Sequence, residues 1–221
     1  MMDIAKLTSP IWVLGTDTGV GKTHVASHIA RAWAKDTPVV YRKPFQTGVV
    51  SDTDVEADAA AVSGPNITVE TGLVLRAPLS PMAAAELEGK KIDLEEMLTW
   101  CKRPVFQGAR LVMEPAGGVM VPLAAGVPFV KWASRLEIPG IVVARGGLGT
   151  LNHVLLTCEA LHAHGWKIAA ILLNPGLDNS FEAARDNAKI LERFLDAPIW
   201  IHEYSVSDSK PRFAPGISAM P

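Results

Sequence analysis

The sequence of 221 residues is 48% hydrophobic and 20% charged, a composition typical of a folded globular protein that excludes a largely disordered chain. Its formal net charge of −2 at pH 7 argues against binding to the phosphate backbone of nucleic acids. The two cysteines stand in no metal-binding or disulfide spacing, the first residues lack the layout of a signal peptide, and no apolar run suggests a membrane span, so we expect a cytoplasmic protein.

Short β-branched runs alternate along the chain with stretches of helical periodicity. Strands are predicted at residues 11–14, 39–43, 110–114, 138–144, 168–173 and 199–201. Longer helices are predicted to begin near Thr23, Leu151 and Phe181. This alternation predicts one α/β domain over residues 1–221, with a doubly wound, mostly parallel sheet covered by helices. Residues 205–221, rich in Ser and Pro, are expected to form a flexible tail.

A long excursion separates the second and third predicted strands. It contains two shorter predicted helices, at residues 54–62 and 93–101, and its connections contain Pro65, Pro78 and Pro81. We expect this excursion to shape a substrate site.

A phosphate-binding loop is predicted directly after the first strand. Residues 15–23 read Gly-Thr-Asp-Thr-Gly-Val-Gly-Lys-Thr, and a predicted helix follows. Glycines let backbone N–H groups turn toward an anion, while Lys22 can reach the β- and γ-phosphates and the Thr23 hydroxyl can bind Mg²⁺. The first glycine of the usual motif would stand at position 16, where this chain has Thr. A turn without a ligand is the weaker interpretation, so we predict a nucleotide-binding fold of the P-loop NTPase type.

Charged side chains also stand at the ends of the second and third predicted strands. Lys43 precedes a Pro-x-x-Thr-Gly turn, and Glu114 precedes a Gly-Gly turn. Because open α/β sheets bind ligands at the carboxyl ends of their strands, Lys43 is predicted to add positive charge there and Glu114 to bind Mg²⁺. Asp54 is a second candidate ligand or a helix N-cap, and Asp58, one helical turn later, is its alternative.

Four segments together closely resemble the dethiobiotin synthetase family, over residues 11–175. They are residues 15–23, Lys-Pro-Phe-Gln-Thr-Gly at 43–48, Glu-Pro-Ala-Gly-Gly at 114–118 and Leu-Gly-Thr-Leu-Asn-His at 148–153. The resemblance implies an ATP-dependent ligase that carboxylates 7,8-diaminononanoate with CO₂ or bicarbonate. A carbamate would form on one amine, a mixed anhydride would follow by phosphorylation, and ring closure would give dethiobiotin, ADP and phosphate. Pro115 departs from the family pattern, which usually has glycine there.

The resemblance also implies roles for individual residues. The catalytic residues would be Lys22, Lys43 and Thr47. The Mg²⁺ cofactor would be bound by Thr23, Asp54 and Glu114. ATP would be bound by Thr18, Gly19, Val20, Gly21, Lys22, Thr23, His24 and Asn174. The substrate would be bound by Thr47, Gly117, Gly118, Thr150, Leu151 and Asn152.

The substrate's distal carboxylate requires a separate anion site. Residues 149–152 open a predicted helix, whose free N–H groups and dipole can receive a carboxylate. The resemblance implies that these residues reach the substrate of the partner subunit in a homodimer.

Two other classes of P-loop protein are alternatives. A partition-type ATPase switch would need a signature lysine near the start of the loop, where positions 16 and 17 are Thr and Asp. An amidating synthetase of the cobyrinic acid type usually carries a glutaminase domain, for which 221 residues are too few.

Overall fold

The computed structural model describes residues 4, 7–49, 62–176, 181–203 and 212–215. An eight-stranded sheet runs through this part of the chain in the order β10-β9-β8-β7-β1-β4-β2-β3. Its strands are β1 (Ile11–Gly15), β2 (Val39–Gln46), β3 (Ile67–Val74), β4 (Arg110–Met113), β7 (Gly140–Arg145), β8 (Ile168–Asn174), β9 (Ile199–Glu203) and β10 (Arg212–Pro215). Neighbouring strands are parallel except β9 and β10, which are antiparallel. The predicted doubly wound, mostly parallel sheet is therefore confirmed.

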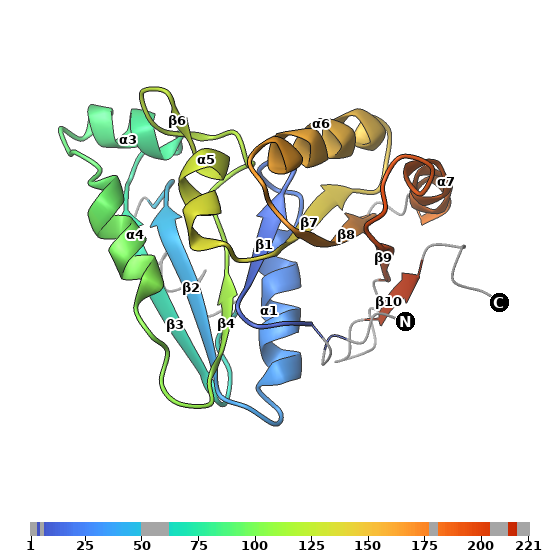
Figure 1. The fold of residues 1–221 in the computed structure, drawn as a ribbon, viewed down its shortest axis with the longest axis horizontal. Coiled ribbons are helices and arrows are strands. Elements are labelled where there is room, and N and C mark those ends of the chain that lie inside the picture. The colour runs from blue at the N-terminus through green and yellow to red at the C-terminus, as the bar shows by residue number, and fades with distance from the viewer. Residues whose placement is uncertain (1–3, 5–6, 50–61, 177–180, 204–211, 216–221) are drawn as a thin grey trace.

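Helices cover both faces of the sheet (Figure 1). They are α1 (Lys22–Trp33), α3 (Pro81–Leu87), α4 (Leu94–Lys102), α5 (Phe129–Ala133), α6 (Thr150–Ala163) and α7 (Phe181–Leu191). A short 3-10 turn, η2 (Ser134–Leu136), follows α5, and a small hairpin of β5 (Pro122–Ala124) and β6 (Val127–Pro128) precedes it. None of the helices in the described ranges is long and apolar enough to cross a membrane.

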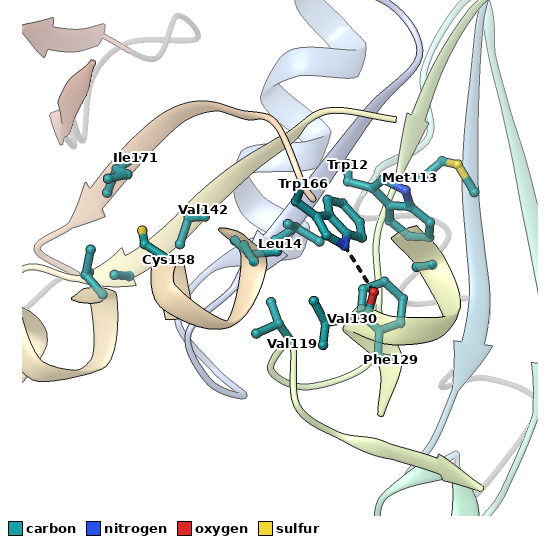
Figure 2. Close-up of a cluster of buried hydrophobic side chains, with 14 of the residues drawn as sticks. Trp12, Leu14, Met113, Val119, Phe129, Val130, Val142, Cys158, Trp166 and Ile171 are labelled. Carbon is teal, nitrogen blue, oxygen red and sulfur yellow. Dashed lines mark hydrogen bonds between the residues drawn. The ribbon is translucent and has the colours of Figure 1, made fainter. Parts of the chain in front are cut away.

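Alternating side chains of the central strand divide the hydrophobic core into two layers. Ile11 and Val13 of β1 face the cluster that contains the apolar side of α1, whereas Trp12 and Leu14 face the cluster under α4, α5, α6 and α7. In the second cluster, Trp12 packs edge-on against Phe129 of α5, with ring centroids 5.2 Å apart (Figure 2). This burial on both faces explains why β1 is a continuous apolar run.

The long excursion differs most from the sequence-based prediction. It contributes the edge strand β3, which the sequence did not predict, because its side chains are only partly buried and Gly72 interrupts its apolar pattern. A Cβ at Gly72 would lie 2.4 Å from the Pro44 carbonyl oxygen, so the close approach of β2 requires glycine. The predicted helix 93–101 is confirmed as α4, which Asp93 caps by accepting hydrogen bonds from the backbone N–H groups of Glu95 and Glu96.

Other short elements were also missed. Helices α3 and α5 have seven and five residues, too few to show a helical period in the sequence. The predicted helix 54–62 lies outside the described residues except for Val62. Within residues 205–221, for which the sequence predicts a flexible tail, Arg212–Pro215 form β10 and pair with β9. The rest of that tail lies outside the described residues.

Candidate active site

A cavity of about 590 Å³ opens at the carboxyl ends of β1, β2 and β4. In Figure 1 the arrowheads of β1 and β2 point toward this edge, near α3 and α6. The cavity is lined by the phosphate-binding loop, the turn after β2 and the turn after β4, and the excursion contributes its residues 78–81. Among the residues predicted for the site, those that line it are Thr18, Gly19, Gly21, Lys22, Thr23, His24, Lys43, Thr47, Glu114 and Gly117.

The phosphate-binding loop adopts a conformation that only glycine accommodates easily. Gly19 and Gly21 have φ angles of 72° and 99°, in the left-handed region. Gly21 is also the N-cap of α1, and within the described part of the chain no side chain caps this helix. The first N–H groups of α1 are therefore left for an anion in the cavity.

Lys22 is folded back over this loop. Its ammonium donates a hydrogen bond to the Asp17 backbone oxygen at 2.9 Å, and its stem packs so closely that a Cβ at Gly15 would lie 2.8 Å from Lys22 Cδ. Burial lowers the pKa of Lys22; the carboxylate of Glu114 opposes this shift, and the charge of Lys43 adds to it. The cavity is therefore lined by two lysines, Lys22 and Lys43, and by the carboxylate of Glu114.

Glu114 is the polar centre of the site and is only 2% exposed. Its Oε1 accepts a hydrogen bond from the Thr23 hydroxyl at 2.7 Å and lies 3.7 Å from Lys43 Nζ. Its Oε2 accepts a hydrogen bond from the Tyr41 hydroxyl at 2.8 Å. Tyr41 was not predicted as a site residue, although its position two residues before Lys43 on a strand indicated that both side chains face the same way.

The Gly-Gly turn after β4 packs directly against the phosphate-binding loop. Gly117 has a φ angle of 69°, and a Cβ there would lie 2.7 Å from Val121 Cγ2. A Cβ at Gly118 would lie 3.1 Å from the Thr16 backbone oxygen. A larger residue at position 118 would crowd the phosphate-binding loop, whereas one at position 117 would be strained by its φ angle and would meet Val121 of the same segment.

The start of α6 lies apart from this cavity, which none of Thr150, Leu151 and Asn152 lines. Gly149 is the N-cap with a φ angle of 88°, and no described side chain caps the helix. The buried hydroxyl of Thr150 has no hydrogen-bond partner in the described ranges, while Asn152 is exposed. The predicted anion site at this helix start therefore has free backbone donors but is separate from the phosphate-binding loop.

Asn174, the last residue of β8, is hydrogen-bonded to the phosphate-binding loop. The Asn174 side-chain amide donates a hydrogen bond to the Val20 backbone oxygen at 2.9 Å, and both residues are buried. A Cβ at Gly21 would lie 2.2 Å from Asn174 Nδ2. Asn174 thus fixes the loop conformation. Asp54 and Asp58, the alternative metal ligands, lie outside the described residues.

Solved structures of similar shape are nucleotide-binding proteins. FlhF in complex with GTP and Mg²⁺ matches with a TM-score of 0.59 at 10% identity, over 95% of this chain and 72% of that one. A protein from Borrelia burgdorferi B31, described as a plasmid partition protein and bound to AMPPNP, matches with a TM-score of 0.55 at 10% identity, over 91% and 93%. At such identities these similarities show the P-loop NTPase fold alone.

Comparison of sequences identifies the family more specifically than the comparison of folds. A family model described as an AAA domain matches residues 10–200. The chain is 40% identical to the ATP-dependent dethiobiotin synthetase BioD of Paramagnetospirillum magneticum over 164 residues, which cover 74% of this chain and 75% of that protein. It is 36% identical to the BioD of Bacillus subtilis over 195 residues, covering 85% and 84%. By this identity and coverage, the chain belongs to the family of ATP-dependent dethiobiotin synthetases.

Proposed function

We propose that this chain converts 7,8-diaminononanoate, CO₂ and ATP into dethiobiotin, ADP and phosphate. The observation that carries the proposal is the contact of Thr23 with Glu114 beside Lys22 and Lys43, at the phosphate-binding loop of a cavity large enough for substrates. The identities to BioD proteins support the same reaction.

The reaction needs three bond-forming steps. One amine attacks CO₂ and loses a proton to give a carbamate. A carbamate oxygen then attacks the γ-phosphorus of ATP and ADP leaves. The second amine attacks the carbamoyl carbon, loses its proton and expels phosphate, which closes the cyclic urea. Each step requires the reacting groups to be held close and in line.

Lys22 and Lys43 are proposed as the catalytic residues for the phosphoryl transfer. The transferring group carries negative charge on its equatorial oxygens, so fixed cations beside it lower the barrier. Both lysines line the cavity and are buried, where their charges are weakly screened. Thr47 also lines the cavity and is proposed to hydrogen-bond the carbamate or the γ-phosphate.

A magnesium ion fits the oxygen ligands beside the loop. The Thr23 hydroxyl and Glu114 carboxylate are hard donors, already 2.7 Å apart, and we propose that they hold Mg²⁺ with Asp54, or with Asp58 as the alternative. The bound ion would neutralise charge on the β- and γ-phosphates. Tyr41 would fix the carboxylate through its hydrogen bond to Glu114 Oε2.

We further propose that the active site is shared across a homodimer. Gly117 and Gly118 would receive the diamine, while Thr150, Leu151 and Asn152 of the partner would bind the distal carboxylate at the start of α6. This arrangement is supported by apolar side chains on the surface beside that helix start, with Leu148 fully exposed and Leu156 62% exposed. The two buried free thiols fit a reducing compartment, and a cytoplasmic location is proposed on that basis.

The function is tested with the purified chain, MgATP, bicarbonate and 7,8-diaminononanoate. ADP and dethiobiotin, identified by mass, are expected in equal amounts. The matched control replaces the diamine by an analogue acetylated on one amine, which has no second amine for ring closure and should give no cyclic product. Phosphate release that does not depend on the diamine would contradict the proposal.

The shared site is tested by mixing two variants that are each inactive alone, Lys43→Ala and Asn152→Trp. In a mixed dimer one site has both defects and the other has neither. Random pairing of equal amounts should therefore restore about a quarter of the wild-type sites. If labelled subunits exchange and no activity returns, Asn152 acts within its own chain.

A further inference from the structure

Three histidines from two distant segments meet on the α1 side of the sheet. His24 and His28 lie one turn apart on α1, and His202 lies on β9, 178 positions from His24. One ring nitrogen of each residue lies within 4.8 Å of the others. The closest pair, His24 Nε2 and His202 Nε2, is separated by 2.8 Å. The ring of His24 also meets that of His28 edge-on, with centroids 4.1 Å apart.

The three imidazoles lie in a partly to fully buried environment. Burial lowers the pKa of His28 to about 4 and that of His202 to about 3, and it also lowers the pKa of His24. The positive charge of Arg31 contributes to the shifts of His24 and His28. An imidazole binds a metal ion in its neutral form, through the lone pair of its unprotonated nitrogen.

We propose that His24, His28 and His202 form a binding site for a transition-metal dication of the Zn²⁺ or Co²⁺ class. Imidazole nitrogens suit these ions, whereas Mg²⁺ prefers oxygen ligands, so this site is distinct from the one proposed at Thr23 and Glu114. Three protein nitrogens leave one tetrahedral position for water or another ligand.

Binding of such an ion requires shifts of the three side chains. Metal–nitrogen distances of about 2.0–2.1 Å in a tetrahedron place ligand nitrogens about 3.3 Å apart. The Nε2 atoms of His24 and His202, now 2.8 Å apart, would separate by about 0.5 Å. The most distant pair of ligand nitrogens, at most 4.8 Å apart, would approach by up to about 1.5 Å. Because His202 is only 1% exposed and sits on a strand, the adjustment falls mainly on side-chain torsions of the two half-buried helix residues.

An ion at this site would join the first helix to the ninth strand. Helix α1 begins at the phosphate-binding loop, and His24 also lines the cavity. Binding should therefore stabilise the folded chain and hold the start of α1 more firmly.

The test uses the full chain without a polyhistidine tag, stripped of metal with a chelator and titrated with Co²⁺ in excess Mg²⁺. We expect one Co²⁺ per chain, with the strong visible absorption of four-coordinate cobalt and a raised melting temperature. The variant His28→Gln should weaken Co²⁺ binding at least tenfold, as expected for loss of one of three protein ligands. The matched control His162→Gln, at an exposed histidine on α6, should bind Co²⁺ like the wild type.

A second variant covers the case in which His28→Gln folds poorly. The variant His28→Cys keeps a metal-binding side chain and should add the near-ultraviolet absorption of a thiolate–cobalt bond. Equal Co²⁺ affinity in wild type and His28→Gln, absence of the visible bands in wild type, or cobalt binding by His28→Cys without thiolate absorption would overturn the proposal. The titration contains no substrate, so its outcome is independent of the proposed synthetase reaction.

Discussion

The Thr23 hydroxyl donates a hydrogen bond of 2.7 Å to Glu114 Oε1, across 91 positions of sequence. This contact connects the start of α1 to the turn after β4, next to Lys43. It places two hard oxygen atoms and an ammonium group at the phosphate-binding loop, where the proposed phosphoryl transfer from ATP would use them.

Replacing Glu114 by Gln should raise the Mg²⁺ concentration that gives half-maximal activity. The change keeps the size of the side chain but removes the charge proposed to bind the ion, so we expect this Mg²⁺ concentration to rise about tenfold or more and turnover to fall. Tyr41→Phe is the matched control, because it removes a hydrogen bond to Glu114 and leaves the charge. Tyr41→Phe should raise the Mg²⁺ concentration for half-maximal activity by about tenfold or less. Wild-type Mg²⁺ dependence in Glu114→Gln would remove Glu114 from the metal site.

The lysines of the cavity should affect turnover far more than stability. Lys22→Ala and Lys43→Ala each remove a cation from the proposed site of phosphoryl transfer, and a loss of about 100-fold or more in kcat is expected. The apolar stripe of α1 is unchanged in both variants, so the melting temperature should move little. Lys35→Ala, at an exposed lysine after α1, is the control and should keep full activity. If the melting temperature fell together with kcat in Lys22→Ala or Lys43→Ala, that lysine would have a structural role instead.

The conformation of the phosphate-binding loop should depend on Asn174. Gly21→Ala introduces a Cβ that would meet Asn174 Nδ2 at 2.2 Å, in addition to backbone strain at a φ angle of 99°. Asn174→Ala should therefore restore part of the stability lost in Gly21→Ala, with a coupling free energy of about 1 kcal/mol in urea unfolding.

Gly19→Ala provides the control for this cycle. Its φ angle of 72° gives similar strain, but no described heavy atom lies within 4 Å of the added Cβ. Asn174→Ala should not improve Gly19→Ala. If Asn174→Ala changed the free energy of unfolding of Gly21→Ala and of Gly19→Ala equally, Asn174 would not contact the loop as described.

The buried thiols predict a loss of stability at alkaline pH. Burial raises the pKa of Cys101 to about 12 and that of Cys158 to about 11, from an ordinary value near 9. Between pH 9 and these values a thiol is ionised in the unfolded chain but still protonated in the folded one. The free energy of unfolding should therefore fall by about 1.4 kcal/mol per pH unit for each thiol.

Urea unfolding at pH 8 and pH 10 measures this effect. The wild type should lose about 1.4 kcal/mol more than Cys158→Ala over that interval. The packing lost with the thiol is the same at both pH values and cancels in the difference. Equal losses in the two proteins would show that the Cys158 thiol ionises freely in the folded state.

The sequence predicted those features that depend on local pattern. The strand–glycine loop–helix unit around Lys22 could be predicted because turn, glycines and helix start are contiguous. The edge strand β3 could not, because its half-exposed residues show no apolar run, and neither could β10, which is defined by its pairing with β9.

Contacts between distant segments were the least predictable part of the site. Lys43 and Glu114 were predicted from their places at strand ends, but the hydrogen bond from Tyr41 to Glu114 depends on β2 and β4 being neighbours in the sheet. Likewise, the i, i+4 spacing of His24 and His28 is visible in the sequence, whereas His202 joins them only through the position of β9. Sheet order is a tertiary property that no local pattern determines.

The proposed attack of a carbamate oxygen on ATP in this cavity can be measured by following oxygen atoms. With freshly added ¹⁸O-labelled bicarbonate, MgATP and the diamine, the released phosphate should contain one ¹⁸O atom per molecule, because ring closure expels the carbamate oxygen with the phosphoryl group. Phosphate that takes its new oxygen from solvent water instead would show that ATP is only hydrolysed, and would rule out attack by a carbamate oxygen.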